Sequence, residues 1–339
     1  MLRPSARPTL VAAACAGLFA LTGCGASGDT GGGGASSFNA TSAPVSPAVA
    51  AAEHPTAADF PRTDGKTLQQ VADTLTPGPQ VGLATSVYTP GMNRLAFGMI
   101  DAKGGYLYDR TAIYVAKSPN APAQGPFVAP ADSLEVRPAF RSQTSANDTD
   151  SVQAIYHTNV RLPSAGEWYV LAVSRVGSKL MGATTQFKVA RSSPIPAVGQ
   201  DAPKVDTPTL ASVGGDVAKI DTRVPPDQMH AVSFRDVVGK RPVMLLFATP
   251  ALCQSRVCGP VTDIAAQLQA AYGKQVTFIH NEVYNDNNPN KGLRPQLTAY
   301  HLTTEPWLFA VNSQGKVVAR LQGAFGINEF RAAVQAAMN

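Results

Sequence analysis

The chain of 339 residues is poor in charged residues, aromatic residues and cysteine. Only 15% of its residues are charged, the formal net charge is +5, and the basic side chains form no run. This dispersion excludes the concentrated positive footprint of a nucleic-acid-binding protein. No period of about 20 to 50 residues repeats, which argues against a solenoid. After residue 25 no apolar stretch reaches the roughly 18 residues that could span a bilayer.

The composition is nevertheless that of a folded protein. Hydrophobic residues make up 44% of the chain, which excludes disorder of the whole. The 29 glycines and 27 prolines indicate many loops and short strands rather than long helices. The length is enough for two ordinary domains.

Residues 1–23 have the pattern of a cleaved leader. Arg3 and Arg7 precede an apolar stretch from Leu10 to Leu21, which is about as long as a signal-peptide core. The stretch ends in Leu-Thr-Gly before Cys24, which resembles the bacterial lipobox. The resemblance implies that Cys24 becomes an acylated N-terminus that anchors the protein to the membrane, with its working part extracytoplasmic. The alternative is an ordinary secretory signal with a chance cysteine.

Residues 24–60 are rich in Gly, Ser and Ala and have few bulky apolar side chains. Such a segment cannot bury enough apolar surface to offset the entropy of ordering. We therefore expect it to be a flexible tether between the anchor and the folded domains.

Residues 75–190 alternate short β-branched and aromatic runs with Gly, Pro, Asn and Asp clusters, which predicts a β-sandwich domain. Seven strands in this length suggest an all-β, immunoglobulin-like sandwich, with Trp168 buried in a late hairpin. His157, Asp101 and Asp109 form no catalytic pattern, so we expect a spacer or a protein-binding module. The predicted strands are 81–88, 94–101, 112–116, 133–140, 152–160, 167–174 and 184–189.

A proline-rich connection is expected over residues 191–229, followed by an α/β domain over residues 230–339. Helices over 261–272 and 327–338 have apolar residues at helical spacing, with Tyr272 and Met338 as the last apolar position of each. The predicted order β-α-β-α-β-β-α packs helices on a mixed sheet. The other elements are strands 242–248, 276–280, 307–311 and 317–321 and a short helix near 293–300.

Five local features of this second domain resemble the thioredoxin superfamily, in particular extracytoplasmic redoxins. The resemblance covers about 140 residues and implies a thioredoxin-like fold, with Pro306 as the cis-proline that precedes a strand. The matching segments are Val198–Pro203, Val232–Lys240, Pro242–Pro250, Thr304–Trp307 and Gly315–Gly323.

Two cysteines remain once Cys15 leaves with the leader and Cys24 is lipidated: Cys253 and Cys258. They lie at a predicted strand-to-helix turn, where helix N-terminal N–H groups stabilise a thiolate. In an oxidising exterior, such a pair forms a disulfide that is either permanent or cycling. A thiolate at this position can exchange with a substrate disulfide.

The spacing of the pair departs from the C-x-x-C of thioredoxins. With four intervening residues, the two side chains of a continuous helix lie too far apart for a disulfide. Either Cys253 lies in the loop before the helix, with Ser255 as a candidate N-cap, or the first turn unwinds when the bond forms. Pro260 favours an irregular helix start.

Two other members of the fold remain as alternatives. Cys253 and Cys258 resemble the cysteine pair of atypical peroxiredoxins, although no threonine stands three residues before Cys253. Copper-chaperone relatives use a closer cysteine pair and a histidine. His280 and His301 exist, but the proline position is retained, so we treat both as structural histidines and predict no metal and no cofactor.

The sequence thus predicts a membrane-anchored thiol–disulfide oxidoreductase, with Cys253 attacking and Cys258 resolving. The central strand lacks the buried acid of thioredoxins, and Glu305, beside Pro306, is the nearest candidate general base. The expected partners are client proteins or small thiols. The non-catalytic alternative is a cell-surface binding lipoprotein in which the same cysteines form a structural disulfide.

Overall fold

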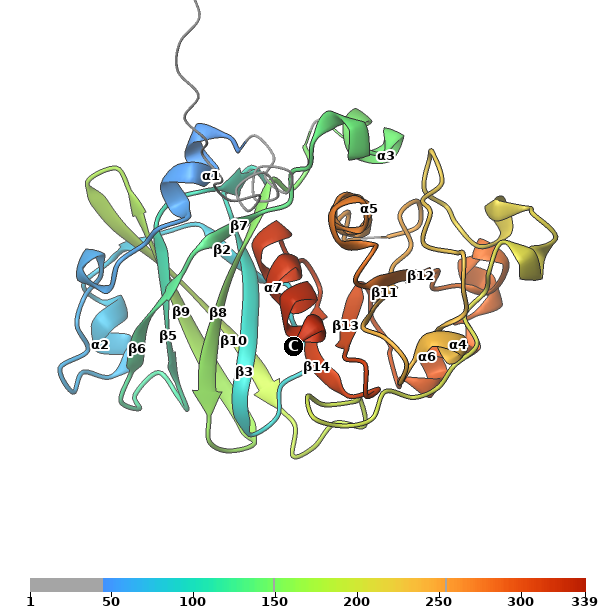
Figure 1. The fold of residues 1–339 in the computed structure, drawn as a ribbon. Coiled ribbons are helices and arrows are strands. Elements are labelled where there is room, and N and C mark those ends of the chain that lie inside the picture. The colour runs from blue at the N-terminus through green and yellow to red at the C-terminus, as the bar shows by residue number, and fades with distance from the viewer. Residues whose placement is uncertain (1–44, 149, 254) are drawn as a thin grey trace, which may run out of the picture. The chain divides into compact units, whose positions relative to one another are not determined.

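The computed structural model describes residues 45–148, 150–253 and 255–339 (Figure 1). The predicted signal peptide, the lipidation of Cys24 and the first part of the tether lie outside these residues. Among the described residues, no helix combines the length and the apolar character that crossing a membrane requires.

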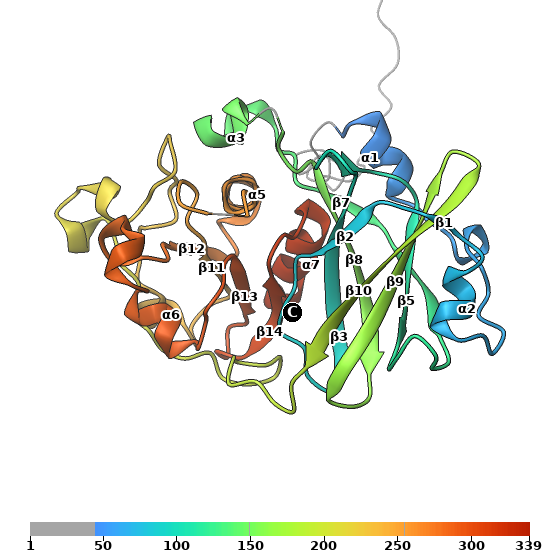
Figure 2. The same ribbon diagram turned by 180° about the vertical axis from the view of Figure 1, so that it is seen from behind.

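The N-terminal half contains two mainly antiparallel β-sheets (Figures 1 and 2). The first has the order β1-β10-β9-β5-β6, with β1 parallel to β10, and the second has the order β2-β3-β8-β7, with β4 paired to β3. The strands are β1 (Thr76–Pro77), β2 (Gln80–Leu83), β3 (Gly91–Ile100), β4 (Tyr106–Leu107), β5 (Thr111–Ala116), β6 (Gln124–Ala129), β7 (Ala131–Ser133), β8 (Ala154–Leu162), β9 (Gly166–Val176) and β10 (Lys179–Val189).

The apolar core between these sheets follows the alternation of strand side chains. Leu95 and Phe97 of β3 face it, as does Trp168 of β9, which is 1% exposed and donates from Nε1 to the Ser164 carbonyl. The opposite face of the first sheet is also covered, because α2 (Leu68–Ala72) packs against Tyr114 of β5. A strand-rich region is therefore present as predicted, while the immunoglobulin-like sandwich stays a prediction.

Part of the segment predicted as tether is folded. Ser46 caps α1 (Pro47–Ala52), and Val49 and Ala52 of this helix are buried in the core between the sheets. A further 3-10 turn, η2, spans Ala57–Asp59. The prediction of a flexible tether is therefore wrong for residues 45–60, because small apolar side chains there find a core to enter.

Two predicted strands need correction. The strand predicted over 81–88 ends at Leu83. The stretch 133–140 holds only the end of β7 and the 3-10 turn η3 (Pro138–Phe140), and α3 (Gln143–Asn147) follows it. Pro138 lacks a backbone N–H, which disfavours continuation of a strand. Conversely, β6 was missed, because its sequence QGPFVA contains Gly and Pro.

The C-terminal half is the expected mixed α/β domain. Its sheet has the order β12-β11-β13-β14, with β12 parallel to β11 and the other neighbours antiparallel. This order agrees with the predicted mixed sheet on which helices pack. The elements are α4 (Phe234–Val237), β11 (Val243–Phe247), α5 (Cys258–Tyr272), β12 (Thr277–Asn281), α6 (Pro295–Ala299), β13 (Trp307–Val311), β14 (Val317–Gln322) and α7 (Ile327–Met338), with 3-10 turns η4 (Ala211–Val213), η5 (Val217–Lys219), η6 (Asn285–Asn287) and η7 (Pro289–Lys291).

Strand β11 is buried on both faces, as its continuous apolar run predicts. Met244 and Leu246 face the core that α5 and α7 cover, and Leu245 and Phe247 face the core that α4 and α6 cover. The predicted apolar faces of the two long helices are confirmed, except that Met338 at the end of α7 is 38% exposed.

The proline-rich segment 191–229 belongs to this domain rather than only leading to it. Ile195, Ala202 and Val205 are buried with Phe234 of α4, and the N–H of Gly199 donates to the carbonyl of Val317 in β14. The domain therefore begins near residue 195, because a few apolar side chains between the prolines suffice to fix the segment.

The outer face of the second sheet packs on the α/β domain. Ala96 of β3 and Ile155 of β8 share one apolar core with α5 and α7, and Figure 1 shows α7 between β8 and β14. Arg94 donates from Nε and Nη2 to the two carboxylate oxygens of Glu329 in α7, at 2.7 and 2.6 Å. The two halves of the described chain are thus joined by apolar packing and by a largely buried ion pair.

Candidate active site

The two cysteines are separated by a loop between β11 and α5. Helix α5 begins at Cys258, so Cys253 lies in the loop five residues before the helix. Of the two arrangements that the spacing allows, the structure therefore has the one with Cys253 in the loop before the helix. Ser255 is not the N-cap, which is Val257; instead the Ser255 hydroxyl lies 3.2 Å from the Cys253 Sγ. Arg256 has a φ of 60°, which turns the loop into the helix.

The two thiols have opposite electrostatic environments. A hydrogen bond from the Cys258 thiol is the largest cause that lowers the pKa of Cys253 to about 6, against the opposing effect of burial. The Ser255 hydroxyl and the backbone N–H groups of Cys258 and Val257 lower this pKa further. Burial, and next the neighbouring Cys253, raise the pKa of Cys258 well above its usual range.

At neutral pH the pair therefore consists of a thiolate and a thiol. Cys253 is partly exposed, whereas Cys258 is buried, and both are free cysteines in the structure. This is the arrangement that an attacking and a resolving cysteine require, since the thiolate is the nucleophile.

The segment before β13 has the expected cis peptide, between Glu305 and Pro306. Burial, and then the negative charge of Cys253, raise the pKa of the Glu305 carboxyl. The charge of Glu305 in turn is one cause of the raised pKa of Cys258. Glu305 thus interacts electrostatically with both cysteines, and its role as a general base stays a prediction.

Tyr284 is a neighbour of this group that the sequence analysis missed. Burial raises the pKa of Tyr284, and the charges of Glu305, Cys253 and Cys258 raise it further. It lies after β12, in a polar loop whose sequence gives no sign of proximity to the cysteines.

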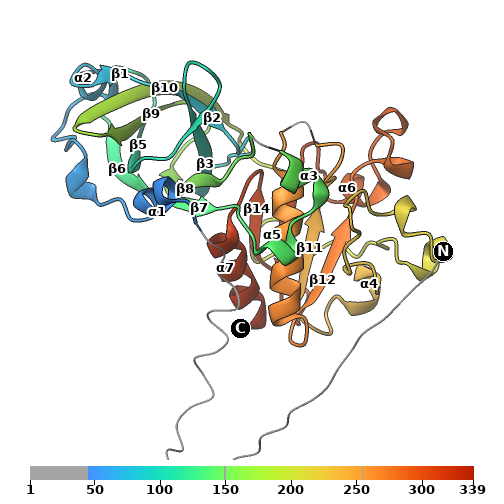
Figure 3. The same ribbon diagram turned by 90° about the horizontal axis from the view of Figure 1, so that it is seen from above.

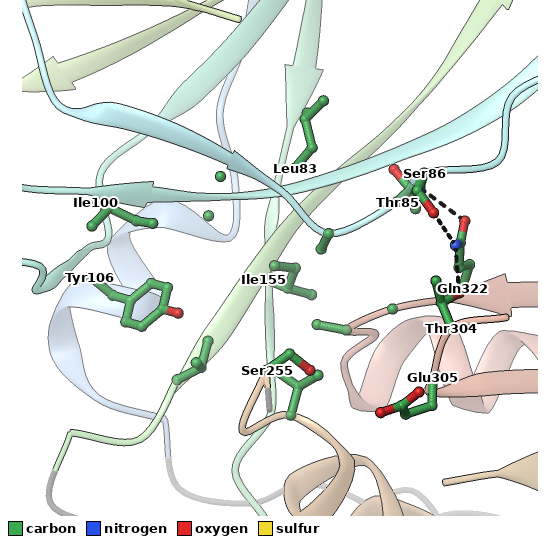
Figure 4. Close-up of a pocket in the computed structure, with 17 residues that line it drawn as sticks. Leu83, Thr85, Ser86, Ile100, Tyr106, Ile155, Ser255, Thr304, Glu305 and Gln322 are labelled. Carbon is green, nitrogen blue, oxygen red and sulfur yellow. Dashed lines mark hydrogen bonds between the residues drawn. The ribbon is translucent and has the colours of Figure 1, made fainter. Parts of the chain in front are cut away.

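Two cavities border the cysteine loop. One, of about 340 Å³, lies between the loop and the second β-sheet, with apolar side chains on the sheet side and Ser255 and Glu305 on the other (Figure 4). The other, of about 400 Å³, is lined by Cys253 itself. Principal residues of the first are Leu83, Ile100, Tyr106, Ile155, Thr304 and Gln322; those of the second include Ser145, Asp148, Pro250, Arg256 and Pro260.

Gln322 links the segment before Glu305 and Pro306 to the connection between β2 and β3. Its Nε2 donates to the hydroxyls of Ser86 at 2.7 Å and Thr304 at 3.2 Å. Its Oε1 accepts from the N–H groups of Ser86 and Val87 (Figure 4 shows part of this network). The first cavity therefore has walls that are held together by hydrogen bonds.

The connection between β7 and β8 brings α3 alongside α5 (Figure 3). Ser142 donates from its N–H and its hydroxyl to Asp263 Oδ2 of α5, at 3.0 and 3.1 Å. Asp148, after α3, forms an ion pair with Arg256 of the cysteine loop. The sandwich region thus supplies part of the surroundings of Cys253, which nothing in the sequence pattern indicated.

The two histidines considered for copper do not approach the cysteines. His280 is buried and hydrogen-bonded to Asp227, and His301 is exposed. Among the described residues, the groups that could hold a metal ion contain neither Cys253 nor Cys258.

Comparison with models of protein families finds no match, and comparison with curated proteins finds none either. Solved structures with similarity include a protein assigned as thiol:disulfide interchange protein DsbE from Chlorobium tepidum (16% identity, 42% of this chain, 99% of that chain, TM-score 0.30). A second is MTB dsbF in its mixed oxidized and reduced forms (17% identity, 40% of this chain, 96% of that chain, TM-score 0.29). A third is a thioredoxin family thiol:disulfide interchange protein from Chlorobium tepidum TLS (17% identity, 42% of this chain, 99% of that chain, TM-score 0.30).

Proposed function

We propose that the chain is a thiol–disulfide oxidoreductase in which Cys253 attacks and Cys258 resolves. The observation that carries the proposal is the asymmetry of the pair: a partly exposed thiol with a pKa of about 6 beside a buried thiol with a raised pKa. At neutral pH only the first is ionised, so only the first can begin the exchange.

The exchange proceeds in two steps. The Cys253 thiolate attacks one sulfur of a client disulfide, forms a mixed disulfide and releases the first client thiolate. Cys258 then loses its proton and attacks the Cys253 sulfur, which releases the second client thiolate. The client disulfide is reduced by two electrons and the Cys253–Cys258 pair is oxidised. The reverse sequence oxidises a client dithiol.

Glu305 is our candidate for accepting the proton of Cys258 in the second step. Its pKa is raised by burial, which brings a carboxylate closer to the range where it acts as a base near neutral pH. Its charge is already felt by Cys258.

The client residues that flank the disulfide would bind in the cavity of Figure 4. Its apolar wall comes from β2, β3 and β8, which gives the sandwich region a role in client selection. Ile100→Gln is expected to weaken reduction of a disulfide peptide with apolar flanking residues several-fold and to leave reduction of glutathione disulfide unchanged. Equal effects on both substrates would contradict this role.

A disulfide peptide tests the two-step scheme. The reduced protein is mixed with the peptide, quenched with acid and analysed by mass. Cys253→Ser should abolish peptide reduction, and Cys258→Ser should accumulate a mixed disulfide on Cys253. A Cys253→Ser variant that still reduces the peptide at the original rate would overturn the assignment.

The same assay tests Glu305. Glu305→Gln is expected to prolong the lifetime of the mixed disulfide by about 10²-fold, the lower end of the contribution of a general base. Glu167→Gln, at an exposed position, is the matched control and should leave the lifetime unchanged. An unchanged lifetime in Glu305→Gln would remove Glu305 from the mechanism.

We also propose that Cys24 carries a lipid that anchors the protein outside the cytoplasm, on the strength of the lipobox-like sequence before it. Incorporation of labelled palmitate that is lost in Cys24→Ser would support the anchor, and equal incorporation in both would contradict it.

A further inference from the structure

A second cluster of chemically active side chains lies apart from the cysteines, between the proline-rich segment and β12. It contains Asp221, Asp227, His230 and His280, whose donor atoms all lie within 4.8 Å of one another. The side chains of both aspartates and of His280 have no exposure, and that of His230 is 4% exposed. The proposed exchange reaction uses none of these groups.

The ring of His280 is oriented as a metal-ligating imidazole usually is. Its Nε2 lies 3.1 Å from the carbonyl oxygen of Ala248, to which it donates. Its Nδ1 points into the cluster, 2.8 Å from Asp227 Oδ2 and 3.9 Å from Asp221 Oδ1. As it stands, Nδ1 is hydrogen-bonded to Asp227 Oδ2. An ion bound at Nδ1 would take the place of the Nδ1 proton, while Nε2 would keep the Ala248 carbonyl as its acceptor.

His230 has no hydrogen-bond partner at either ring nitrogen, although it is buried. Its Nε2 lies 3.4 Å from Asp227 Oδ1 and 3.6 Å from Asp221 Oδ2. Charge-assisted N–H···O bonds are about 2.7 to 2.9 Å long, so these separations are too long for an imidazolium that donates to the carboxylates. A tetrahedral ion with bonds of about 2.0 to 2.1 Å holds its ligands roughly 3.3 to 3.4 Å apart, which is close to the two separations at His230. The 2.8 Å between His280 Nδ1 and Asp227 Oδ2 would lengthen when an ion replaces the proton between them.

The two carboxylates are already fixed by the backbone. Asp221 accepts from the N–H groups of Arg223 at 2.8 Å and Asp227 at 2.7 Å, and Asp227 Oδ1 accepts from the N–H of Met229 at 2.8 Å. Such supporting hydrogen bonds orient ligands before an ion arrives.

We propose that Asp221, Asp227, His230 and His280 bind one divalent transition-metal ion of the zinc type in a closed site. Two imidazoles with two carboxylates suit this class better than soft copper(I), which prefers thiolates, or calcium, which prefers oxygen ligands alone. Four protein ligands leave no open position, as in structural zinc sites. The ion would fasten residues 221–230 to β12, beside the carbonyl of Ala248 that precedes the cysteine loop.

Zinc binding is measured on the full chain with Cys253→Ser and Cys258→Ser, so that no thiolate at this pair binds the metal. After treatment with a chelator, equilibrium dialysis against Zn²⁺ and elemental analysis should give one ion per chain. His230→Gln in the same background should lose this ion. His157→Gln is the matched control, because His157 belongs to the other group with metal-ligand geometry, where Arg94 already binds Glu329.

Thermal unfolding separates loss of a ligand from loss of the fold. Because His230 makes no hydrogen bond, His230→Gln without metal should unfold at a temperature no lower than the chelator-treated parent. Zn²⁺ should raise the unfolding temperature of the parent and of His157→Gln, but not that of His230→Gln. A parent chain that retains no zinc, or a His230→Gln variant that retains it fully, would overturn the proposal.

Discussion

At the scale of single residues, Cys253 and Cys258 acquire different chemistry from their surroundings. The start of α5 directs N–H groups at Cys253, while the apolar core buries Cys258. The resemblance to the thioredoxin superfamily led to Cys253, Cys258, Pro306 and Glu305 as candidate site residues, and their roles stay predictions. The sequence could not predict Tyr284, Asp148 or the ligands of the proposed metal site, because these come together only through tertiary packing.

The rate of alkylation by iodoacetamide reports the ionisation of Cys253. Its pH dependence in the reduced protein should give an apparent pKa of about 6. Cys258→Ser should change this pKa more than Ser255→Ala, because the Cys258 thiol is the largest cause of the lowered value. An apparent pKa near 9, the ordinary value of the thiol, would contradict the assignment of Cys253 as nucleophile.

The same shift predicts a pH dependence of stability. The thiol ionises near pH 9 in the unfolded chain and near pH 6 in the folded chain, so the unfolded state binds more protons between these values. The contribution of Cys253 to the free energy of unfolding therefore grows as pH rises from 6 to 9 and is lost as pH falls through 6. Urea unfolding of the reduced protein at pH 6 and 8 should show this rise, and Cys253→Ala should reduce it. Equal pH dependence in both proteins would contradict the prediction.

At the scale of elements, helix α5 is held by the connection that carries α3 and by the proline-rich segment. Asp263 of α5 accepts from Ser142 and also from Arg223 Nε at 2.8 Å, in a pair whose side chains are 1% and 5% exposed. This carboxylate thus fixes both the sandwich connection and the proline-rich segment against the helix.

Asp263→Ala should lower the free energy of unfolding by about 3 to 5 kcal/mol, because it leaves the buried Arg223 guanidinium with two carbonyl acceptors but no carboxylate. Asp206→Ala is the control, since it breaks the exposed pair with Arg235 and should cost less than about 1 kcal/mol. Chemical denaturation measures both. Similar small losses in the two variants would show that Asp263 does not fasten these elements.

Elements whose apolar residues recur with a clear helix or strand period were predictable from the sequence, and elements fixed only by tertiary packing were not. The strands and helices predicted for the α/β domain lie within a few residues of their predicted bounds, because burial on one or two faces imposes a strict apolar pattern. The short helix α4 was missed. Helix α1 and residues 195–205 have a weak pattern of their own. They are ordered because small apolar side chains, such as Val49 and Ala202, enter cores built by distant strands.

At the scale of the whole described chain, the second sheet and the α/β domain behave as one packed unit. Arg94 donates to the carbonyls of Gln322 and Ala324 as well as to Glu329, so it fixes the end of β14 and the start of α7 together. The cavity of Figure 4 exists only while this packing holds, because its walls come from both halves.

Gly323 is a sensitive point of this packing. It has a φ of +70°, and a Cβ there would overlap the carbonyl oxygen of Ala84. Gly323→Ala should destabilise the protein by more than the roughly 1 kcal/mol that left-handed backbone costs an alanine. Gly214→Ala is the control, with a φ of +65° and open space around its Cβ position. In thermal unfolding, Gly323→Ala should have a lower unfolding temperature than Gly214→Ala. A higher unfolding temperature for Gly323→Ala would contradict this packing.

The central claim is that Cys253 and Cys258 cycle between dithiol and disulfide. The direct measurement is to equilibrate the protein with glutathione buffers over a range of potentials and to count free thiols by alkylation and mass. Our account predicts a reversible Cys253–Cys258 disulfide with a reduction potential within about −120 to −270 mV, the range of exchange proteins. A bond that stays closed well below about −300 mV would identify a structural disulfide, and two thiols that never pair would exclude exchange by this site.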